Sequence, residues 1–300
     1  MDTAFPQDWI IPDWPAPARV HALCTTRKGG FSSGLFGTTN LSLNVGDEAA
    51  HVLQNRALLA QAMQALETQK ALNGAAGSPA TVVAGASPPS QPVFVRQVHG
   101  TEVKYIDQCA TSGQDADASV SDTPGMGCAV MAADCLPVIF SHANLPVVGA
   151  AHAGWRGLVG QGGVGVLETC FAAYAQLVRK HLGQDMSLAD IAAQTLAWLG
   201  PCISQPEFEV GPEVQAAFVE HDASAAACFA AGKPGKFQAD LSALARHRLQ
   251  RQGITRLYGN DSSPVWCTVR NPERFFSHRR DGVPGVQGGS GRFAACVWVA

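Results

Sequence analysis

The sequence predicts an α/β protein in which mixed β-sheets are flanked by helices. Short apolar runs that are broken by Gly, Pro or Asn fill the middle of the chain, and such runs are typical of buried strands. They comprise residues 93–99, 127–133, 136–140 and 146–152. Because segments with helical periodicity precede and follow these runs, we expect helices to cover the sheets.

Apolar periodicity predicts four helices. Residues 51–66 repeat apolar side chains at steps of three and four, which predicts a helix that covers a sheet. Residues 166–182 carry their apolar side chains on one face and follow a glycine-rich stretch. Two further helices are expected at residues 211–221 and 240–253, and the latter ends at a glycine.

The remaining segments complete the predicted layout. Residues 195–204, 254–258 and 293–300 read as strands. Residues 72–91 are rich in Ala, Gly, Ser and Pro, so they cannot bury much apolar surface. We therefore expect a single catalytic domain over residues 1–300, with a flexible insertion at 72–91.

Composition excludes several classes of partner. The 300 residues include 21 Lys plus Arg against 24 Asp plus Glu, for a net charge of -3, and no basic tract. Nucleic acid is therefore not an expected partner. The first residues lack the pattern of a signal peptide, and no apolar run reaches the length of a membrane span. Nine cysteines without a C-x-x-C pair indicate reduced thiols, so we expect a cytoplasmic protein without a membrane partner.

Two histidines and one cysteine form the candidate catalytic site. His99 lies in QVHG, Cys135 in AADCLPV and His152 in AHAGWRG. Two imidazoles and a thiolate are ligands that Zn²⁺ prefers, and catalytic zinc sites keep a fourth position for water or substrate. The three residues therefore predict a catalytic metal site, and the chain reads as an enzyme.

A single buried His or Cys is more often a packing residue than a ligand, so sequence context decides. Glycines flank His152 on its C-terminal side, and glycine costs backbone entropy that packing alone does not justify. Asp134 precedes Cys135 within an apolar strand, where an unpaired carboxylate is costly. We expect an imidazole or an arginine to partner Asp134. The long separations between the three candidates do not match a zinc finger.

Two arginines are candidate ligands of substrate or phosphate. Arg27 and Arg156 both lie next to glycines, which allow the backbone to approach a ligand closely. A solvated surface role is equally compatible with both residues. The glycine-rich run that precedes residue 166 lacks the lysine of a P-loop, so it predicts a flexible connection rather than a nucleotide site.

The motifs QVHG, ADCLPV, HAGWRG and GPCIS closely resemble those of the YfiH family, which is also called the multicopper polyphenol oxidoreductase or laccase-domain family. The resemblance extends from TTRKGGFS and LSLNVGD to FFSHRRDG, and so covers nearly the whole chain. It implies a YfiH-like α/β fold and a zinc site at the positions of His99, Cys135 and His152. Asn44 and His278, which lie in two of these motifs, are expected to bind substrate.

The resemblance further implies phosphate-dependent cleavage of adenosine, inosine and methylthioadenosine, together with deamination of adenosine. The expected partners are thus a small nucleoside and phosphate. We hypothesise that the metal activates water for deamination, and that Arg27 or Arg156 orients phosphate for cleavage.

Three alternatives stay open. Cys135 could be the nucleophile of a hydrolase that edits a peptidoglycan precursor, with a His base and no metal. The family's older name implies a copper-dependent polyphenol oxidase, although such enzymes typically use His-x-His pairs and the nine histidines include none. Lastly, the site could store Zn²⁺ or copper without catalysis.

Overall fold

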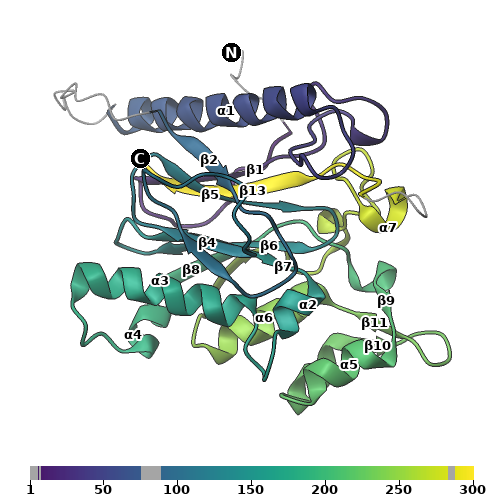
Figure 1. Cartoon of the computed structure of the whole chain (residues 1–300). Coiled ribbons are helices and arrows are strands. Elements are labelled where there is room, and N and C mark those ends of the chain that lie inside the picture. The colour runs from purple at the N-terminus through teal and green to yellow at the C-terminus, as the bar shows by residue number, and fades with distance from the viewer. Residues whose placement is uncertain (1–5, 7, 76–88, 283–287) are drawn as a thin grey trace.

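The structure is a computed structural model that describes residues 6, 8–75, 89–282 and 288–300. Two larger sheets form its centre (Figure 1). The four-stranded sheet contains, in spatial order, β1 (Val20–Cys24), β13 (Phe293–Val299), β5 (Met126–Ala132) and β2 (Gln91–Phe94). The six-stranded sheet contains β12 (Arg256–Gly259), β8 (Thr195–Leu199), β6 (Leu136–His142), β7 (Val148–Ala153), β4 (Ala118–Ser121) and β3 (Val103–Tyr105).

Both sheets are mixed, as the sequence predicts. In the four-stranded sheet β2 pairs with β5 in parallel, whereas β13 pairs with β1 and β5 in antiparallel orientation. In the six-stranded sheet the pairs β12–β8 and β3–β4 are parallel and the others are antiparallel.

Helices cover the outer faces of the two sheets, which face each other (Figure 1). Helix α1 (Ala49–Ala75) lies over the four-stranded sheet. Helices α3 (Val166–Leu182), α4 (Leu188–Ala193) and α6 (Leu241–Arg251) lie below the six-stranded sheet. The result is a four-layer arrangement of helix, sheet, sheet and helices.

Side-chain alternation along the central strands builds this layering. On β5, Val130 packs between the two sheets, while Ala129 and Met131 face α1 with Leu59. On β6, Ile139 likewise belongs to the layer between the sheets. Because successive strand residues point to opposite faces, strands with two buried faces read as continuous apolar runs.

Smaller elements surround these layers. A three-stranded sheet comprises β10 (Phe229–Ala231), β11 (Phe237–Ala239) and β9 (Glu209–Val210). The short helices are α2 (Trp155–Val159), α5 (Pro212–Val219) and α7 (His278–Asp281). Short 3₁₀ helices occur at Gly34–Phe36, Gln205–Glu207, Ala223–Cys228 and Pro264–Trp266. Within the described part of the chain, no helix combines the length and apolarity of a membrane span.

The observed elements differ from the predicted ones mainly at their ends. Helix α1 begins earlier and ends later than residues 51–66, so residues 72–75 are helical rather than part of a loop, and Gln91 starts β2. Residues 76–88 of the expected insertion lie outside the described residues. The strand predicted at 93–99 ends at Phe94. Beyond it, Arg96 forms only an isolated bridge with Asp115, and the backbone amides of residues 98–100 bind a side chain instead of a neighbouring strand.

Candidate active site

Strand pairing brings two of the three candidate ligands together. His152 lies near the end of β7, opposite Pro137 of β6, and Cys135 precedes β6 by one residue. His99 comes from the loop after β2 and not from a strand end, which corrects the sequence-based expectation. Its φ of 61° turns the loop sharply toward the other two residues.

The three side chains form a compact group of donor atoms. One ligand atom from each residue lies within 4.8 Å of the others, and Cys135 Sγ is 3.9 Å from His99 Nε2. Donors in a tetrahedral zinc site are about 3.3–3.6 Å apart, given zinc–nitrogen and zinc–sulfur bonds of about 2.0 and 2.3 Å. Small side-chain adjustments would therefore suffice, and the donor set fits a metal ion. His152 is buried, whereas His99 is exposed.

A carboxylate that the sequence analysis missed organises this group. Asp117, fully buried next to β4, accepts a bond of 2.8 Å from His152 Nδ1. It also accepts the backbone N–H groups of Val98, His99 and Gly100 at 3.1, 2.9 and 2.6 Å. A carboxylate on Nδ1 orients the imidazole and leaves Nε2 free for a metal. Asp117 thus fixes one ligand through its ring and another through its backbone.

The same group forms a charged pair when no metal is bound. Burial alone raises the pKa of the Cys135 thiol, but the neighbouring His152 and His99 lower it below its usual value. Burial likewise lowers the pKa of His152, yet Cys135 and Asp117 raise it above its usual value. A thiolate next to an imidazolium is therefore the favoured form, and a thiolate is the form that binds metals.

The hydrogen-bond partners of Asp134 are not the imidazole or arginine side chain expected from the sequence, although Arg292 is close enough for its charge to interact with Asp134. Its carboxylate accepts the Thr268 hydroxyl at 2.5 Å and the backbone N–H of Arg279 at 2.6 Å. The residue lies in the turn between β5 and β6, with a φ of 87°, rather than inside a strand. Asp134 therefore fixes the turn that presents Cys135, and the imidazole's carboxylate partner is Asp117.

The glycines after His152 are required by close contacts. A Cβ atom on Gly154 would lie 2.9 Å from Cys135 Sγ and 3.1 Å from His99 Cδ2. One on Gly157 would lie 2.7 Å from the carbonyl oxygen of Gly100. The distances of 2.9 and 2.7 Å are too short for a real Cβ, so glycine at these positions lets α2 pack against the loop that carries His99.

The candidate ligands border a cavity of about 400 Å³. Asn44 and His278, both expected at the site, line the same cavity. Arg292, which the sequence analysis did not single out, lines it as well and is close enough to Cys135 for their charges to interact. The remaining lining residues are Ser42, Val45, Arg96, Gln97, Met131, Ala132, Ala133 and Gly288.

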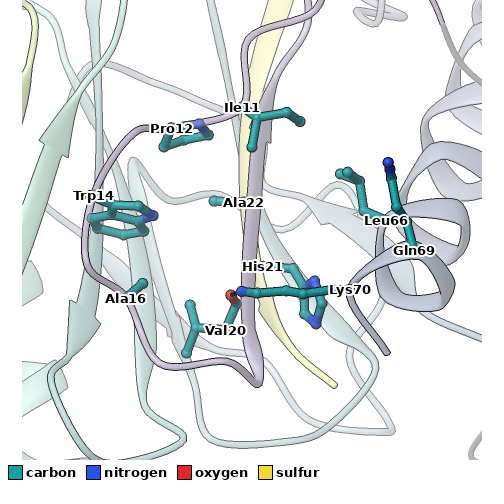
Figure 2. Close-up of a pocket in the computed structure, with 10 residues that line it drawn as sticks. All are labelled: Ile11, Pro12, Trp14, Ala16, Val20, His21, Ala22, Leu66, Gln69 and Lys70. Carbon is teal, nitrogen blue, oxygen red and sulfur yellow. Dashed lines mark hydrogen bonds between the residues drawn. The ribbon is translucent and has the colours of Figure 1, made fainter. Parts of the chain in front are cut away.

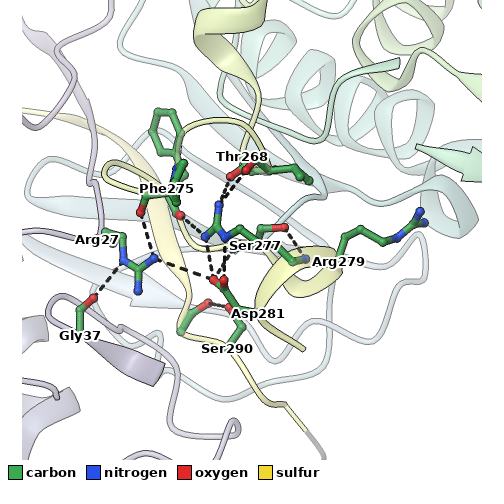
Figure 3. Close-up of polar contacts among 12 residues, drawn as sticks. Arg27, Gly37, Thr268, Phe275, Ser277, Arg279, Asp281 and Ser290 are labelled. Atoms are coloured by element: carbon green, nitrogen blue, oxygen red, sulfur yellow. Dashed lines mark hydrogen bonds and ion pairs between the residues drawn. The ribbon is translucent and has the colours of Figure 1, made fainter. Parts of the chain in front are cut away.

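The structure does not bring Arg27 or Arg156 to this cavity. The Arg27 guanidinium donates to the carbonyl oxygens of Gly37 and Pro272 at 3.1 and 3.0 Å, and lies 3.9 Å from Asp281 (Figure 3). Arg156 is exposed and stacks over the ring of Trp155. The roles of these arginines in substrate binding stay predictions.

A sequence signal for Asp117 existed, whereas one for Arg292 did not. Asp117 stands directly before the small, fully buried residues of β4, where a carboxylate needs a buried partner. Arg292 directly precedes β13, far along the chain from the three candidate ligands. Only the pairing of β13 with β5, between Phe293 and Ala132, brings it to the site.

Residues 21–85 and 76–300 match the sequence model of the multi-copper polyphenol oxidoreductase laccase family. The chain is 38% identical over 290 residues to "Purine nucleoside phosphorylase YfiH" of Escherichia coli, and the alignment covers 97% of this chain and 98% of the relative. It is 37% identical over 292 residues to "Purine nucleoside phosphorylase PA4543" of Pseudomonas aeruginosa, with coverage of 97% and 98%. The crystal structure of the Neisseria meningitidis protein NMB0706 superposes with a TM-score of 0.71 at 36% identity, covering 98% of this chain and 99% of that one.

Proposed function

Because this chain belongs to the multi-copper polyphenol oxidoreductase laccase family, we propose that it is a zinc-dependent purine nucleoside phosphorylase that also deaminates adenosine. Its substrates are adenosine, inosine and methylthioadenosine, each together with phosphate for the cleavage reaction. The names of the two relatives support this assignment. The observation that carries it is one cavity that holds both a metal-ligand set and a guanidinium.

His99, Cys135 and His152 would hold the zinc ion. When bound, zinc supplies Lewis acidity and lowers the pKa of water, which suits deamination at the amino-bearing carbon. In this proposal Arg292 binds phosphate, since a guanidinium matches phosphate geometry. His278 and Asn44, which line the same cavity, orient the nucleoside by hydrogen bonding.

The direct test is to incubate the purified protein with inosine, with and without phosphate, and to separate the products by chromatography. Hypoxanthine and ribose 1-phosphate should appear only with phosphate, because phosphate is the attacking group. With adenosine alone, inosine should appear. Cys135→Ser should abolish both reactions, and an unchanged product profile in that variant would contradict the proposal.

Arginine variants distinguish the candidate phosphate ligands. Arg292→Met should raise the KM for phosphate about tenfold or more, since a charge-assisted hydrogen bond contributes about 1.5–3 kcal/mol. Arg27→Met and Arg156→Met are the matched controls, because neither residue lines the cavity. If instead one of these two variants raises the KM and Arg292→Met does not, the phosphate ligand was assigned to the wrong arginine.

A cysteine hydrolase that edits a peptidoglycan precursor is the second candidate. Cys135, His152 and Asp117 are arranged as a nucleophile, a base and an orienting group would be, because Cys135 lies close to His152 and Asp117 binds Nδ1 of the same ring. Metal removal separates the two candidates. A hydrolase would keep its amide-cleaving activity after chelation and lose it in Cys135→Ser, whereas the phosphorylase reaction should stop in both cases. The copper oxidase gains less support, because the described residues form one metal-ligand group with two imidazoles.

A further inference from the structure

We propose that a second cavity, between the N-terminal segment, β1 and α1, binds a small anion with a flat apolar body, such as an aromatic carboxylate. This cavity measures about 230 Å³ and shares no lining residue with the candidate active site. It is therefore independent of the metal ligands and of the proposed phosphorylase reaction.

The walls of the cavity are apolar on two sides (Figure 2). Ile11, Pro12 and Trp14 come from the segment before β1, and Leu66 comes from α1 on the other side. An indole ring, a proline and two branched aliphatic side chains offer flat apolar surface. A planar ring is the body that such a slot accommodates best.

His21 is the buried polar group of this cavity. Its side chain lies on β1, is only 7% exposed, and stacks on Trp298 with ring centroids 5.5 Å apart. Among the described residues, neither of its ring nitrogens has a hydrogen-bond partner. Burial, aided by the charge of Lys70, lowers the pKa of His21 to about 4, so the ring is neutral at pH 7 and offers one N–H donor.

Two further donors line the same space. Lys70 donates to the carbonyl oxygen of Val20 at 3.0 Å, which leaves two of its three N–H groups available. Within the described part of the chain, Lys70 has no carboxylate within ion-pair distance, and the Trp14 indole N–H has no acceptor. The Lys70 side chain is exposed overall, but its partial burial lowers its pKa, and a bound anion would favour its charged form.

No acidic side chain lines the cavity among the described residues. Two acids are adjacent in sequence to lining residues, and neither lines the cavity. Asp13, between Pro12 and Trp14, is exposed. Glu67 accepts the Trp298 indole N–H at 2.6 Å and the Ser90 hydroxyl. The cavity therefore presents donors and one positive charge without a counter-charge. A carboxylate would accept hydrogen bonds from these donors and neutralise the positive charge. The cavity volume equals that of about seven or eight water molecules at roughly 30 Å³ each, which suits a body of one or two fused rings.

Calorimetric titration of the full-length protein with indole-3-carboxylate tests the proposal, with indole-3-carboxamide as the uncharged probe. The carboxylate should bind, and the carboxamide should bind about tenfold more weakly or not at all, because it lacks the charge that Lys70 pairs with. Lys70→Met should weaken carboxylate binding by about the same factor. His21→Phe keeps the ring stacked on Trp298 and removes the donor, so it should weaken binding as well.

Two control variants make the outcome specific. Lys104→Met removes a half-buried lysine that pairs with Glu102 outside this cavity, and it should leave binding unchanged. Cys135→Ser should also leave binding unchanged, which separates this site from the metal cavity. Equal binding of the two probes, absence of carboxylate binding, or full binding by Lys70→Met would each overturn the proposal. Because Lys70 is exposed, its variant should fold even if His21→Phe does not.

Discussion

Asp117 shows how a single buried carboxylate can preorganise a candidate metal site. One of its oxygens accepts both the His152 ring and the His99 backbone, and the other accepts the amides of Val98 and Gly100. An unpaired buried carboxylate would be costly, so Asp117 keeps its hydrogen bonds to the His99 loop and to the His152 ring, and these bonds fix the positions of both. The geometry of the ligands is thus set before any metal binds.

Asp117→Asn should lower zinc affinity about 10–100-fold, because the amide cannot accept four N–H donors as a carboxylate does. The affinity can be measured by competition with a chromophoric chelator. Asp122→Asn is the matched control, since Asp122 also binds an imidazole, that of His181, away from the site. Equal zinc affinities in the two variants would show that Asp117 does not position the ligands.

The Cys135 thiol should react unusually fast at neutral pH in the metal-free protein. Because the pKa of this thiol is lowered by His152 and His99, the thiolate persists as the pH falls below the usual thiol range of about 8.5. Iodoacetamide labelling followed by peptide mass spectrometry, across about pH 5–9, measures the midpoint. His152→Ala should move that midpoint upward, and an unmoved midpoint would rule out the thiolate–imidazolium pair.

At the scale of elements, three connections meet at the site. The loop after β2 carries His99, the β5–β6 turn carries Cys135, and the end of β7 carries His152. Helix α2 starts directly after β7 and packs against the His99 loop, so Gly154 lies between two of the ligands.

Gly154→Ala should reduce zinc binding while leaving the fold intact. Its φ of -69° and ψ of 155° are allowed for alanine, so the backbone is not strained, but the new methyl would collide with Cys135 Sγ. Metal content after dialysis, compared with the thermal midpoint, measures this separation. Gly232→Ala is the control, because Gly232 does not line the cavity and an added Cβ would lie 3.2 Å from a backbone oxygen. This variant should retain full zinc content.

At the scale of the whole molecule, Arg280 ties the C-terminal segments to one another and to the N-terminal region. It donates to the carbonyl oxygens of Thr268 and Phe275 at 2.7 and 2.9 Å, and pairs with Asp281 through two nitrogens (Figure 3). Asp281 lies 3.9 Å from Arg27. This network joins segments that are far apart in the sequence, next to the α7 residue that lines the active-site cavity.

Arg280→Met should lower the free energy of unfolding by about 2–4 kcal/mol, because it leaves several carbonyl groups and a carboxylate without their donor. Urea denaturation measures this loss. Arg251→Met removes an ion pair with Asp222 in which the arginine is 58% exposed, and should cost less than about 1 kcal/mol. Similar losses in the two variants would mean that the Arg280 network contributes little.

Sequence patterns predicted the layers of the fold and the three candidate ligands, but not the residues that surround these ligands, Asp117 and Arg292. Apolar runs with two buried faces identified β5, β6 and β7, since each face is covered by another layer. The predicted strand at 93–99 was too long, and its last amides, from Val98 onward, bind the Asp117 side chain rather than a neighbouring strand. No local pattern reports such a contact.

The sequence by itself determined which residue types could bind a metal and which faces had to be buried, because donor chemistry and hydrophobic periodicity are local properties. The tertiary structure alone decided that Asp117 rather than Asp134 orients an imidazole, and that Arg292 rather than Arg27 borders the cavity. The physical reason is that these choices depend on contacts between separate segments. The pairing of β13 with β5 joins residues more than a hundred positions apart, and the Asp117 side chain binds the His99 loop and the His152 ring from next to β4.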